Sequence, residues 1–260
     1  MWKLLAQSVA GSRHLRLGKQ CQDACRVAFE LIADLPTLIL VCADGAGSAR
    51  FAEIGAAQTC ETLVDLALAD MRDGLMPEAI ERDTVLYWAG EARKRLDREA
   101  AQRQAALRDF ASTMLMAVIG ERSAAFAQIG DGAIVTRYGE DYHPVFWPQA
   151  GEYANSTYFL TQEDFADHLE FVRFDDRIDE LAMFSDGLQR LALNMASRIG
   201  HRPFFEPLFA RLRAAANGDD LCEPLRQFLE SSRVAQRSDD DKTLILATRV
   251  TPRVEPTNPL

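Results

Sequence analysis

Short apolar runs separated by longer polar stretches form the basic pattern of this chain. Each run is bounded by Gly, Asp or Pro, which is typical of buried β-strands rather than of helices. We therefore predict strands at residues 38–43, 113–119, 124–129, 133–138, 181–184 and 243–248. Residues 1–9 and 25–32 carry a weaker version of the same pattern and are predicted as further strands.

Two tight turns separate three consecutive runs, Gly-Glu-Arg at 120–122 and Gly-Asp-Gly at 130–132, and predict an antiparallel meander. Between the strand blocks, apolar residues recur at helical spacing. We predict helices at residues 51–69, 77–110, 203–216 and 219–232. Asp219 or Asp220 would cap the last of these helices. Strands in blocks with helices in pairs favour a layered α+β domain over a doubly wound α/β fold.

The composition is that of an ordinary globular protein, with 260 residues of which 48% are hydrophobic and 26% are charged. This length corresponds to one large domain or two small ones. The net charge of −10 argues against nucleic acid and anionic membrane as partners, because polyanions need a basic face. The same acidic excess is what a divalent-cation site requires, since Mg²⁺ and Mn²⁺ prefer carboxylate oxygens.

The cysteine pattern indicates a reducing environment. The five cysteines are odd in number and contain no C-x-x-C pair, which argues against a disulfide framework and a zinc ribbon. The apolar stretch at the N-terminus is too short for a signal peptide, and no run of about 18 apolar residues occurs. We therefore expect a cytoplasmic protein without a membrane partner.

Acidic residues stand at the ends of four predicted strands. Asp44 and Asp186 each close an apolar run, Asp131 lies in the turn at 130–132, and the triple Asp at 239–241 precedes the last strand. A single Asp-Gly is the commonest hairpin signal, so for Asp131 alone a turn is the favoured interpretation. Four such positions together are less easily explained as turns. Converging carboxylates repel one another unless cations neutralise them, which predicts a Mg²⁺ or Mn²⁺ site.

These acids occur within a series of motifs that resembles a known family. The chain resembles the metal-dependent type 2C serine/threonine protein phosphatases, and more closely their atypical bacterial branch. Each motif is weak alone, but the series follows the family's order over residues 8–250. The motifs are Gly-Ser-Arg-His at 11–14, Gly-Lys-Gln-Cys-Gln-Asp-Ala at 18–24, Asp-Gly-Ala-Gly-Ser-Ala at 44–49, Ala-Ser-Thr at 111–113, Gly-Asp-Gly at 130–132, Ser-Asp-Gly at 185–187 and Asp-Asp-Lys-Thr at 240–243.

The resemblance implies a four-layer α-β-β-α sandwich. In this fold two antiparallel sheets face each other, helix pairs lie outside them, and a metal site lies at one edge. We expect a single catalytic domain over residues 1–250. Residues 251–260 contain three prolines and are predicted to form an irregular tail.

The resemblance also implies a centre of two Mn²⁺ or Mg²⁺ ions. Carried over by position, Asp44 bridges the two ions and the carbonyl of Gly45 binds one of them. Asp186 and Asp240 bind the other ion. Asp23 acts mainly through metal-bound water.

Other positions concern a third ion and the surroundings of the site. Asp131 matches the family's position for a weaker third metal. Gln22 stands where the family has Glu, which removes one negative charge, and Asp241 replaces an Asn, which restores one. Residues 144–167 occupy the place of the family's substrate-facing flap, although they could also form an ordinary loop.

The phosphate contact is the main departure from the family. Its phosphate-binding arginine would fall near Gly18, where this chain has no Arg. The basic residues that could replace it are Arg13, His14, Arg16 and Lys19. The pattern does not choose between them. We take Arg16 and Arg13 as candidates, because a guanidinium grips phosphate bidentately, and His14 as a candidate general acid. A surface loop residue is the alternative interpretation of His14.

The activity implied is hydrolysis of phosphoserine and phosphothreonine in proteins by direct attack of a metal-bridging hydroxide. The partners would be phosphorylated proteins, together with a cognate Ser/Thr kinase. One alternative is a pseudophosphatase, a scaffold of the same fold without turnover. A second is a phosphatase of small phosphate esters or nucleotides, and the last is a purely structural α+β domain.

Overall fold

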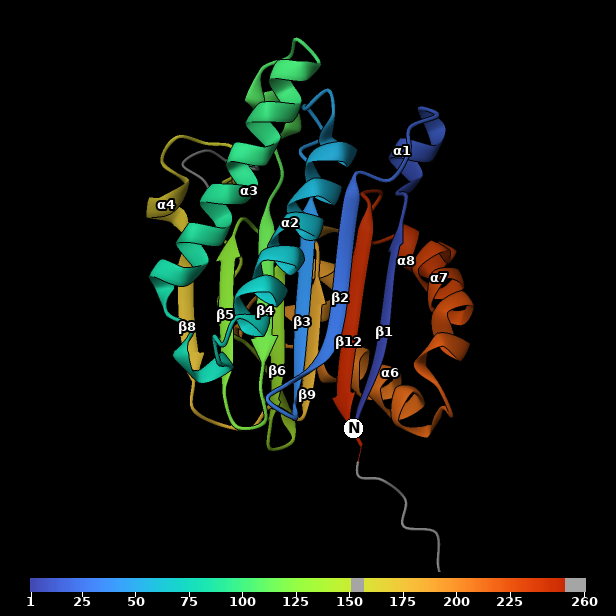
Figure 1. Cartoon of the computed structure of the whole chain (residues 1–260). Coiled ribbons are helices and arrows are strands. Elements are labelled where there is room, and N and C mark those ends of the chain that lie inside the picture. The colour runs from blue at the N-terminus through green and yellow to red at the C-terminus, as the bar shows by residue number, and fades with distance from the viewer. Residues whose placement is uncertain (151–156, 251–260) are drawn as a thin grey trace, which may run out of the picture.

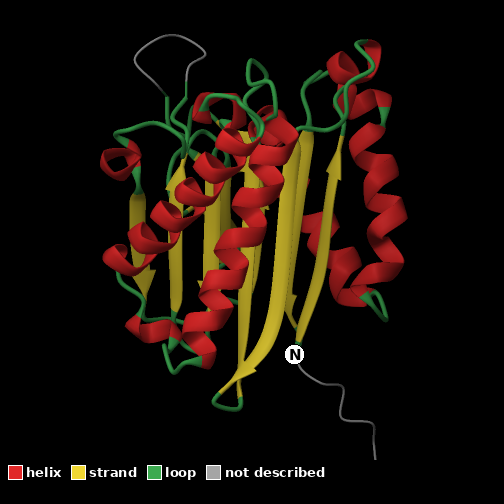
Figure 2. Ribbon diagram, turned by 45° about the horizontal axis from the view of Figure 1, so that its top comes forward, coloured by secondary structure: helices red, strands yellow, loops and turns green. Residues whose placement is uncertain are grey.

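The chain folds into two five-stranded antiparallel sheets that pack face to face, with helices on both outer faces (Figures 1 and 2). The computed structural model describes residues 1–150 and 157–250. The α+β class and the four-layer sandwich predicted above are therefore confirmed. The expected irregular tail at 251–260 lies outside the described residues.

Each of the two large sheets has five strands. Sheet I has the order β2 (Asp23–Ile32), β3 (Leu35–Asp44), β4 (Met114–Ile119), β5 (Ala124–Ile129) and β8 (Glu170–Phe174). Sheet II has the order β1 (Trp2–Val9), β12 (Lys242–Arg249), β9 (Glu180–Phe184), β6 (Ala133–Tyr138) and β7 (Asp141–Pro144). A separate small sheet pairs β10 (Leu193–Asn194) with β11 (Ile199–Gly200).

Two helix layers cover the sandwich. The α-helices are α1 (Ser12–Arg16), α2 (Ala52–Arg72), α3 (Arg82–Gln102), α4 (Phe165–His168), α5 (Gln189–Ala192), α6 (Arg202–Ala214), α7 (Cys222–Glu230) and α8 (Ser232–Ala235). The 3₁₀ turns are η1 (Pro77–Ala79), η2 (Leu107–Phe110), η3 (Asp186–Leu188) and η4 (Gly218–Leu221). Helices α2 and α3 pack on sheet I, and α6 and α7 pack on sheet II. No helix in the described ranges is long and apolar enough to cross a membrane.

Side-chain alternation along each strand divides the core into three layers. On β3, Leu38, Leu40 and Cys42 point toward sheet II, and Ile39 and Val41 point toward α2 and α3. Both faces are buried, which explains why this strand is an unbroken apolar run rather than an alternating one. The central layer between the sheets holds them at a fixed distance, so groups at their ends keep fixed positions.

The predicted helix at 77–110 is broken into three pieces, so its length was wrong. Pro77 starts only the short turn η1, and α3 begins later, where the side chains of Glu81 and Thr84 form a reciprocal capping box. The helix ends before Gln104, whose φ of 54° is left-handed and cannot continue an α-helix.

The expected N-cap of the last helix was also wrong. Asn217, not Asp219 or Asp220, is the capping residue, and it caps the turn η4. The Asn217 side chain accepts from the amide of Asp219, and the Asp220 carboxylate accepts from the amide of Asn217. Helix α7 starts only after this turn, at Cys222. Both aspartates serve the turn rather than the helix.

The predicted meander is contradicted at its second turn. Strands β4 and β5 pair as expected, but β6 pairs with β7 and β9 in sheet II. The Gly-Asp-Gly at 130–132 therefore carries the chain from one sheet to the other. Gly130 has a φ of +110°, which L side chains rarely adopt. The consequence is that Asp131 lies between the two sheets instead of at a hairpin tip.

We predict that Leu40→Ala lowers the free energy of unfolding by about 2–5 kcal/mol, because it leaves a cavity in the fully buried layer between the sheets. Urea unfolding would measure the change. The matched control is Leu31→Ala, since Leu31 is 59% exposed and its truncation should change stability by only about 0.5 kcal/mol or less. Equal effects of the two substitutions would contradict this layer assignment.

Candidate metal centre and active site

The predicted acidic positions meet at one edge of the sandwich. Asp23 begins β2 and Asp44 ends β3, and the two residues are direct cross-strand partners. In sheet II, β9 ends just before Asp186 and β12 begins just after Asp240. The hydroxyl of Ser185 joins the two sheets, because it donates to Oδ2 of Asp23 at 2.6 Å.

Burial and mutual repulsion raise the pKa values of these carboxyl groups. Burial, together with the charge of Asp241, raises the pKa of Asp23 to about 7, although the Ser185 hydrogen bond opposes the shift. The pKa of Asp44 is raised well above its ordinary value by burial, and then by the charges of Asp23 and Asp186. Each group therefore responds to the charge of the others.

Two more carboxyl groups belong to the same set. Burial and then the charge of Asp186 raise the pKa of Asp131 to about 6. The pKa of Asp186 is raised by burial and then by the charge of Asp240. The structure thus brings together the five aspartates that the sequence singled out, at positions 23, 44, 131, 186 and 240.

The donor set fits a hard divalent cation. Oδ1 of Asp23 and Oδ1 of Asp186 are buried and have no hydrogen-bond partner among the described residues. Such orphaned oxygens cost free energy unless a ligand satisfies them. No three His, Cys, Asp or Glu side chains within the described ranges converge as a preformed coordination sphere. Carboxylates that hold an ion partly through water, as Mg²⁺ sites do, agree with this spacing.

Gly45 lets the backbone approach this edge closely. A Cβ at this position would lie 2.6 Å from the carbonyl oxygens of Gln22 and Ala52, so no other residue fits without a shift. The amide of Gly45 donates to the Gln22 carbonyl at 3.1 Å. The loop after β3 is therefore tied to the start of β2, directly beside Asp23 and Asp44.

The three consecutive aspartates at 239–241 have three different environments. Asp239 is exposed and lies 3.5 Å from the guanidinium of Arg16. Asp240 is half-buried and faces the other carboxylates. Asp241 is buried and accepts from the amides of Gly11 and Gln22, both at 2.6 Å. Asp241, which stands where the family has Asn, thus links the N-terminal segment to the start of β12.

His14 belongs to the Asp241 network. Its ring is buried, and Nδ1 lies 2.8 Å from Oδ2 of Asp241. The interpretation of His14 as an exposed loop residue is therefore wrong. Because Nδ1 is paired with Asp241, only Nε2 is left to contact another group. Proton donation by His14 would have to come from Nε2, and this role stays a prediction.

The candidate phosphate contacts lie close together at this edge. Arg13 and Arg16 are exposed residues of α1, and Lys19 follows that helix. The amide of Arg13 donates to the carbonyl of Asp239, which anchors α1 beside the acidic set. Phosphate binding by one of these side chains stays a prediction.

Two residues that the sequence reasoning missed support the site. Ser185 accepts from the amide of Thr243 at 2.9 Å while it donates to Asp23. Lys242 is buried, its pKa is lowered by burial, and its Nζ donates to the carbonyl of Asp240 at 2.6 Å. A buried Lys beside Asp240 and Asp241 offsets part of their charge. Ser185 was visible within the Ser-Asp-Gly motif, but no pattern indicated the burial of Lys242.

The flap region begins next to Asp131. The amide of Gly130 donates to Oε1 of Gln149 at 2.6 Å, and Nε2 of Gln149 donates to the carbonyl of His168 at 2.8 Å. Both ends of the stretch at 144–167 are thereby held near the acidic edge. Residues 151–156, the middle of the predicted flap, lie outside the described residues.

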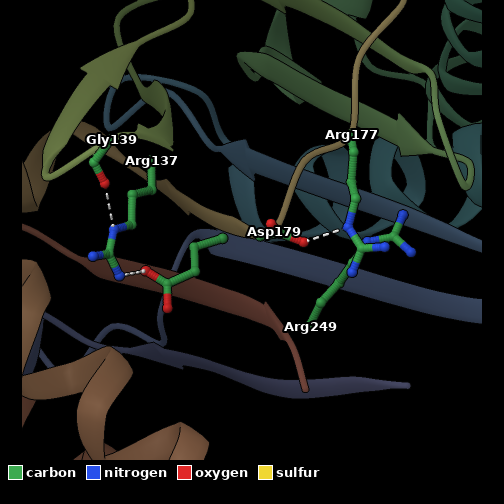
Figure 3. A pocket seen from close by; sticks show the side chains of 6 residues that line it. Arg137, Gly139, Arg177, Asp179 and Arg249 are labelled. Atoms are coloured by element: carbon green, nitrogen blue, oxygen red, sulfur yellow. Dashed lines mark hydrogen bonds and ion pairs between the residues drawn. The ribbon is translucent and has the colours of Figure 1, made fainter. Parts of the chain in front are cut away.

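A second charged pocket lies at the opposite ends of the strands (Figure 3). Its arginines all contact carboxylates or carbonyls: Arg137 donates to Glu180, Arg177 to Asp179, and Arg249 to Glu121. Glu180 is itself buried in this network. The pocket is therefore a structural ion-pair cluster, and the acidic edge is the better candidate for chemistry.

Comparison with known proteins agrees with this geometry. The family model for protein phosphatase 2C matches residues 10–230. Serine/threonine-protein phosphatase 3 of Escherichia coli (strain K12) is 39% identical over 251 residues, which cover 95% of this chain and 98% of that protein. The chain belongs to the protein phosphatase 2C family. The resemblance predicted from the motifs is therefore confirmed, and members of this family are metal-dependent phosphatases.

Solved structures of bacterial phosphatases have the same fold as this 2C family member. The serine/threonine phosphatase Stp1 from Staphylococcus aureus matches with a TM-score of 0.62 at 16% identity, covering 96% of both chains. A bacterial serine phosphatase matches with a TM-score of 0.65 at 16% identity, covering 98% of this chain and 100% of that one. The likeness confirms the sandwich architecture.

We predict that Asp241→Asn lowers the free energy of unfolding of this family member by about 1–3 kcal/mol. An Asn would place an NH₂ group against one of the N–H donors of Gly11, Gln22 and His14, which would lose its acceptor. The control is Asp239→Asn, two residues away, because the Asp239 side chain is 60% exposed. Equal stability of both variants in urea unfolding would contradict the tying role of Asp241.

We also predict that the protein without divalent cations loses stability as the pH rises from about 4 to about 8. A carboxyl with a raised folded-state pKa binds its proton more tightly in the folded protein. Its stabilisation is complete below the ordinary value near 4 and is lost as the pH passes the folded values of about 7 for Asp23 and about 6 for Asp131.

Urea unfolding in EDTA at a series of pH values would measure this loss. Asp23→Asn should flatten the profile, and the control Asp97→Asn, at an exposed position of α3, should leave it unchanged. Mn²⁺ should restore stability at pH 8. A wild-type profile that is flat or rises with pH would contradict the coupling of these carboxyls.

Proposed function

We propose that this protein hydrolyses phosphoserine and phosphothreonine in protein substrates with two Mn²⁺ or Mg²⁺ ions. The observation that carries the proposal is the convergence of five carboxyl groups at one edge of a rigid sandwich, where burial and mutual charge raise the pKa values of Asp23, Asp44, Asp131 and Asp186. Groups held together against their own repulsion need cations to neutralise them. This arrangement has no structural benefit of its own, which disfavours a purely structural domain.

The acidic residues divide into proposed ligands and supports. Asp44 and the carbonyl of Gly45 would hold one ion, with Asp44 shared between both, and Asp186 and Asp240 would hold the other. Asp23 would hold water beside them through Oδ1, which has no hydrogen-bond partner in the described part of the chain. Asp131 is the proposed position for a weaker third ion. When bound, such ions supply positive charge and activate water near neutral pH.

The chain's own residues orient these groups. Ser185 fixes Oδ2 of Asp23 and leaves Oδ1 without a hydrogen-bond partner among the described residues. Lys242 holds the carbonyl of Asp240, and the Asp241 network anchors the segment before β2. Rigid supports of this kind keep the reacting groups aligned, which is a major part of catalysis in phosphoryl transfer.

Phosphate binding and proton transfer fall to the N-terminal segment. Arg16 and Arg13 would grip the phosphoryl oxygens, with Lys19 as the alternative cation. His14 would donate a proton from Nε2 to the departing Ser or Thr oxygen, because Asp241 occupies its Nδ1. These roles follow from position and from the hydrogen bonds of His14.

A covalent enzyme intermediate is not part of the proposal. Burial raises the pKa values of the Cys21 and Cys25 thiols, which keeps them protonated and poorly nucleophilic. The hydroxyl of Ser185 is held by Asp23 and by the amide of Thr243. Direct attack of water on phosphorus therefore suits this site best.

The proposed partners are phosphorylated proteins and the Ser/Thr kinase that phosphorylates them. We place the reaction in the cytoplasm, because all five cysteines are free thiols, the state expected in a reducing compartment. A scaffold without turnover is the second candidate, favoured by the missing arginine near Gly18. Metal-dependent turnover of a phosphopeptide separates an active phosphatase from a scaffold.

Purified protein should hydrolyse a phosphothreonine peptide and an aryl phosphate only when Mn²⁺ or Mg²⁺ is added. Loss of a residue that merely supports a metal ligand costs about 10–100-fold, so Asp44→Asn and Asp186→Asn should each lower kcat/KM by at least about 100-fold. Asp97→Asn is the matched control with full activity. If metal-saturated wild type turns over no faster than Asp44→Asn, the protein is a scaffold.

A further inference from the structure

A large groove outside the acidic site opens on the helix layer over sheet II. It has a volume of about 990 Å³ and is lined from α5, the β10–β11 hairpin, α6, α7 and α8. Figure 1 shows α6, α7 and α8 together on the outer side of β1 and β12. None of the groups assigned above to metal, phosphate or proton transfer lines this groove.

The charge of the groove is opposite to that of the chain. Arg190, Arg211, Arg233, Arg237 and His201 line it, and no Asp or Glu does. The four arginines are exposed, and none forms an ion pair with a carboxylate among the described residues. The chain as a whole carries a net charge of −10, whereas the charged residues around this groove are basic. Unneutralised guanidinium groups around one groove favour an anionic occupant.

The walls of the groove are apolar. Phe204 and Phe228 lie with their ring centroids 6.2 Å apart, and Leu225 and Leu208 extend the same surface. Met195 at the rim is 58% exposed. A phosphate backbone or a simple anion would leave this apolar surface exposed to solvent. An acidic polypeptide segment with apolar side chains would cover them and also meet the arginines.

The groove reaches toward the acidic edge. Arg237 lies three residues before Asp240, and Arg190 lies four residues after Asp186. Three or four residues span at most about 11–14 Å even when fully extended. A chain bound in the groove can therefore continue to the metal edge within a few residues of its own.

We propose that this groove docks an acidic segment with Phe or Leu anchors, carried by the phosphoprotein substrate close to its phosphorylated residue. This inference rests on the proposed phosphatase function and adds a substrate class to it. Docking beside the reaction site raises the effective concentration of the phosphorylated residue. It therefore lowers KM for such substrates and leaves kcat for small phosphate esters unchanged.

Fluorescence anisotropy with a labelled, non-phosphorylated peptide rich in Glu, with one Phe and one Leu, tests the docking directly. Arg211→Glu/Arg233→Glu should weaken binding at least about tenfold, because two attractive contacts become repulsive. The matched control is Arg122→Glu, an exposed Arg in the β4–β5 turn outside the groove. Thermal unfolding of each variant checks that the fold is intact.

Two comparison peptides test the stated chemistry. Replacing Glu by Lys, or Phe and Leu by Ala, should each abolish most of the binding. Equal affinity of wild type and the double variant, or equal affinity for the Lys peptide, would overturn the proposal. This binding measurement does not depend on turnover, so it stands even if the protein proves to be a scaffold.

Kinetics then separate docking from catalysis. With a phosphothreonine peptide that carries the acidic and apolar segment, the double variant should raise KM at least about tenfold with kcat unchanged. With an aryl phosphate, both parameters should match those of wild type. A fall in kcat for both substrates would overturn the docking role, and no activity in wild type would instead count against the proposed function.

Discussion

Repulsion among buried carboxylates is the constraint on which the rest of this structure depends. Five aspartates from both sheets are held at one edge, where burial and mutual charge raise the pKa values of four of them, Asp23, Asp44, Asp131 and Asp186. Repulsion by itself would drive such groups apart. They stay together because two sheets, fixed by the apolar layer between them, leave their ends no room to move apart.

Hydrogen-bond donors and one buried cation stabilise the carboxylates at this edge. The Ser185 hydroxyl satisfies one oxygen of Asp23, and the buried ammonium of Lys242 stands beside Asp240. Asp241 meets the amides of Gly11 and Gln22 and the ring of His14. The altered opening motif of this chain and its Asp at the family's Asn position thus form one network. The carboxylate of Asp241 has only acceptor oxygens and can therefore accept from all three groups. An Asn side chain has one acceptor oxygen and one NH₂ group, so it would leave at least one donor without an acceptor.

Charge is distributed unevenly over the molecule, and the distribution separates two tasks. The acidic edge suits cations, which in turn suit a phosphoryl group. The arginine-rimmed groove over sheet II lies next to it and suits an acidic polypeptide. The ion-pair cluster around Glu180, in contrast, neutralises itself and serves stability. Net charge alone would have suggested none of these differences.

The sequence by itself determined the family, the acidic candidates and eight strands of the two large sheets, because apolar runs and strand-end motifs are local patterns. It did not predict the shorter strands β7, β8, β10 and β11. The motif match separated Asp240, as a metal ligand, from Asp241, at the family's Asn position. Only the tertiary structure showed that Asp239 is exposed, that Asp240 faces the site and that Asp241 is buried in a hydrogen-bond network. It also placed Asp131 between the sheets, because strand pairing joins residues far apart in the chain. The buried His14, the Lys242 contact and the basic groove arise in the same way. They depend on which distant segments pack together, and no local pattern encodes that.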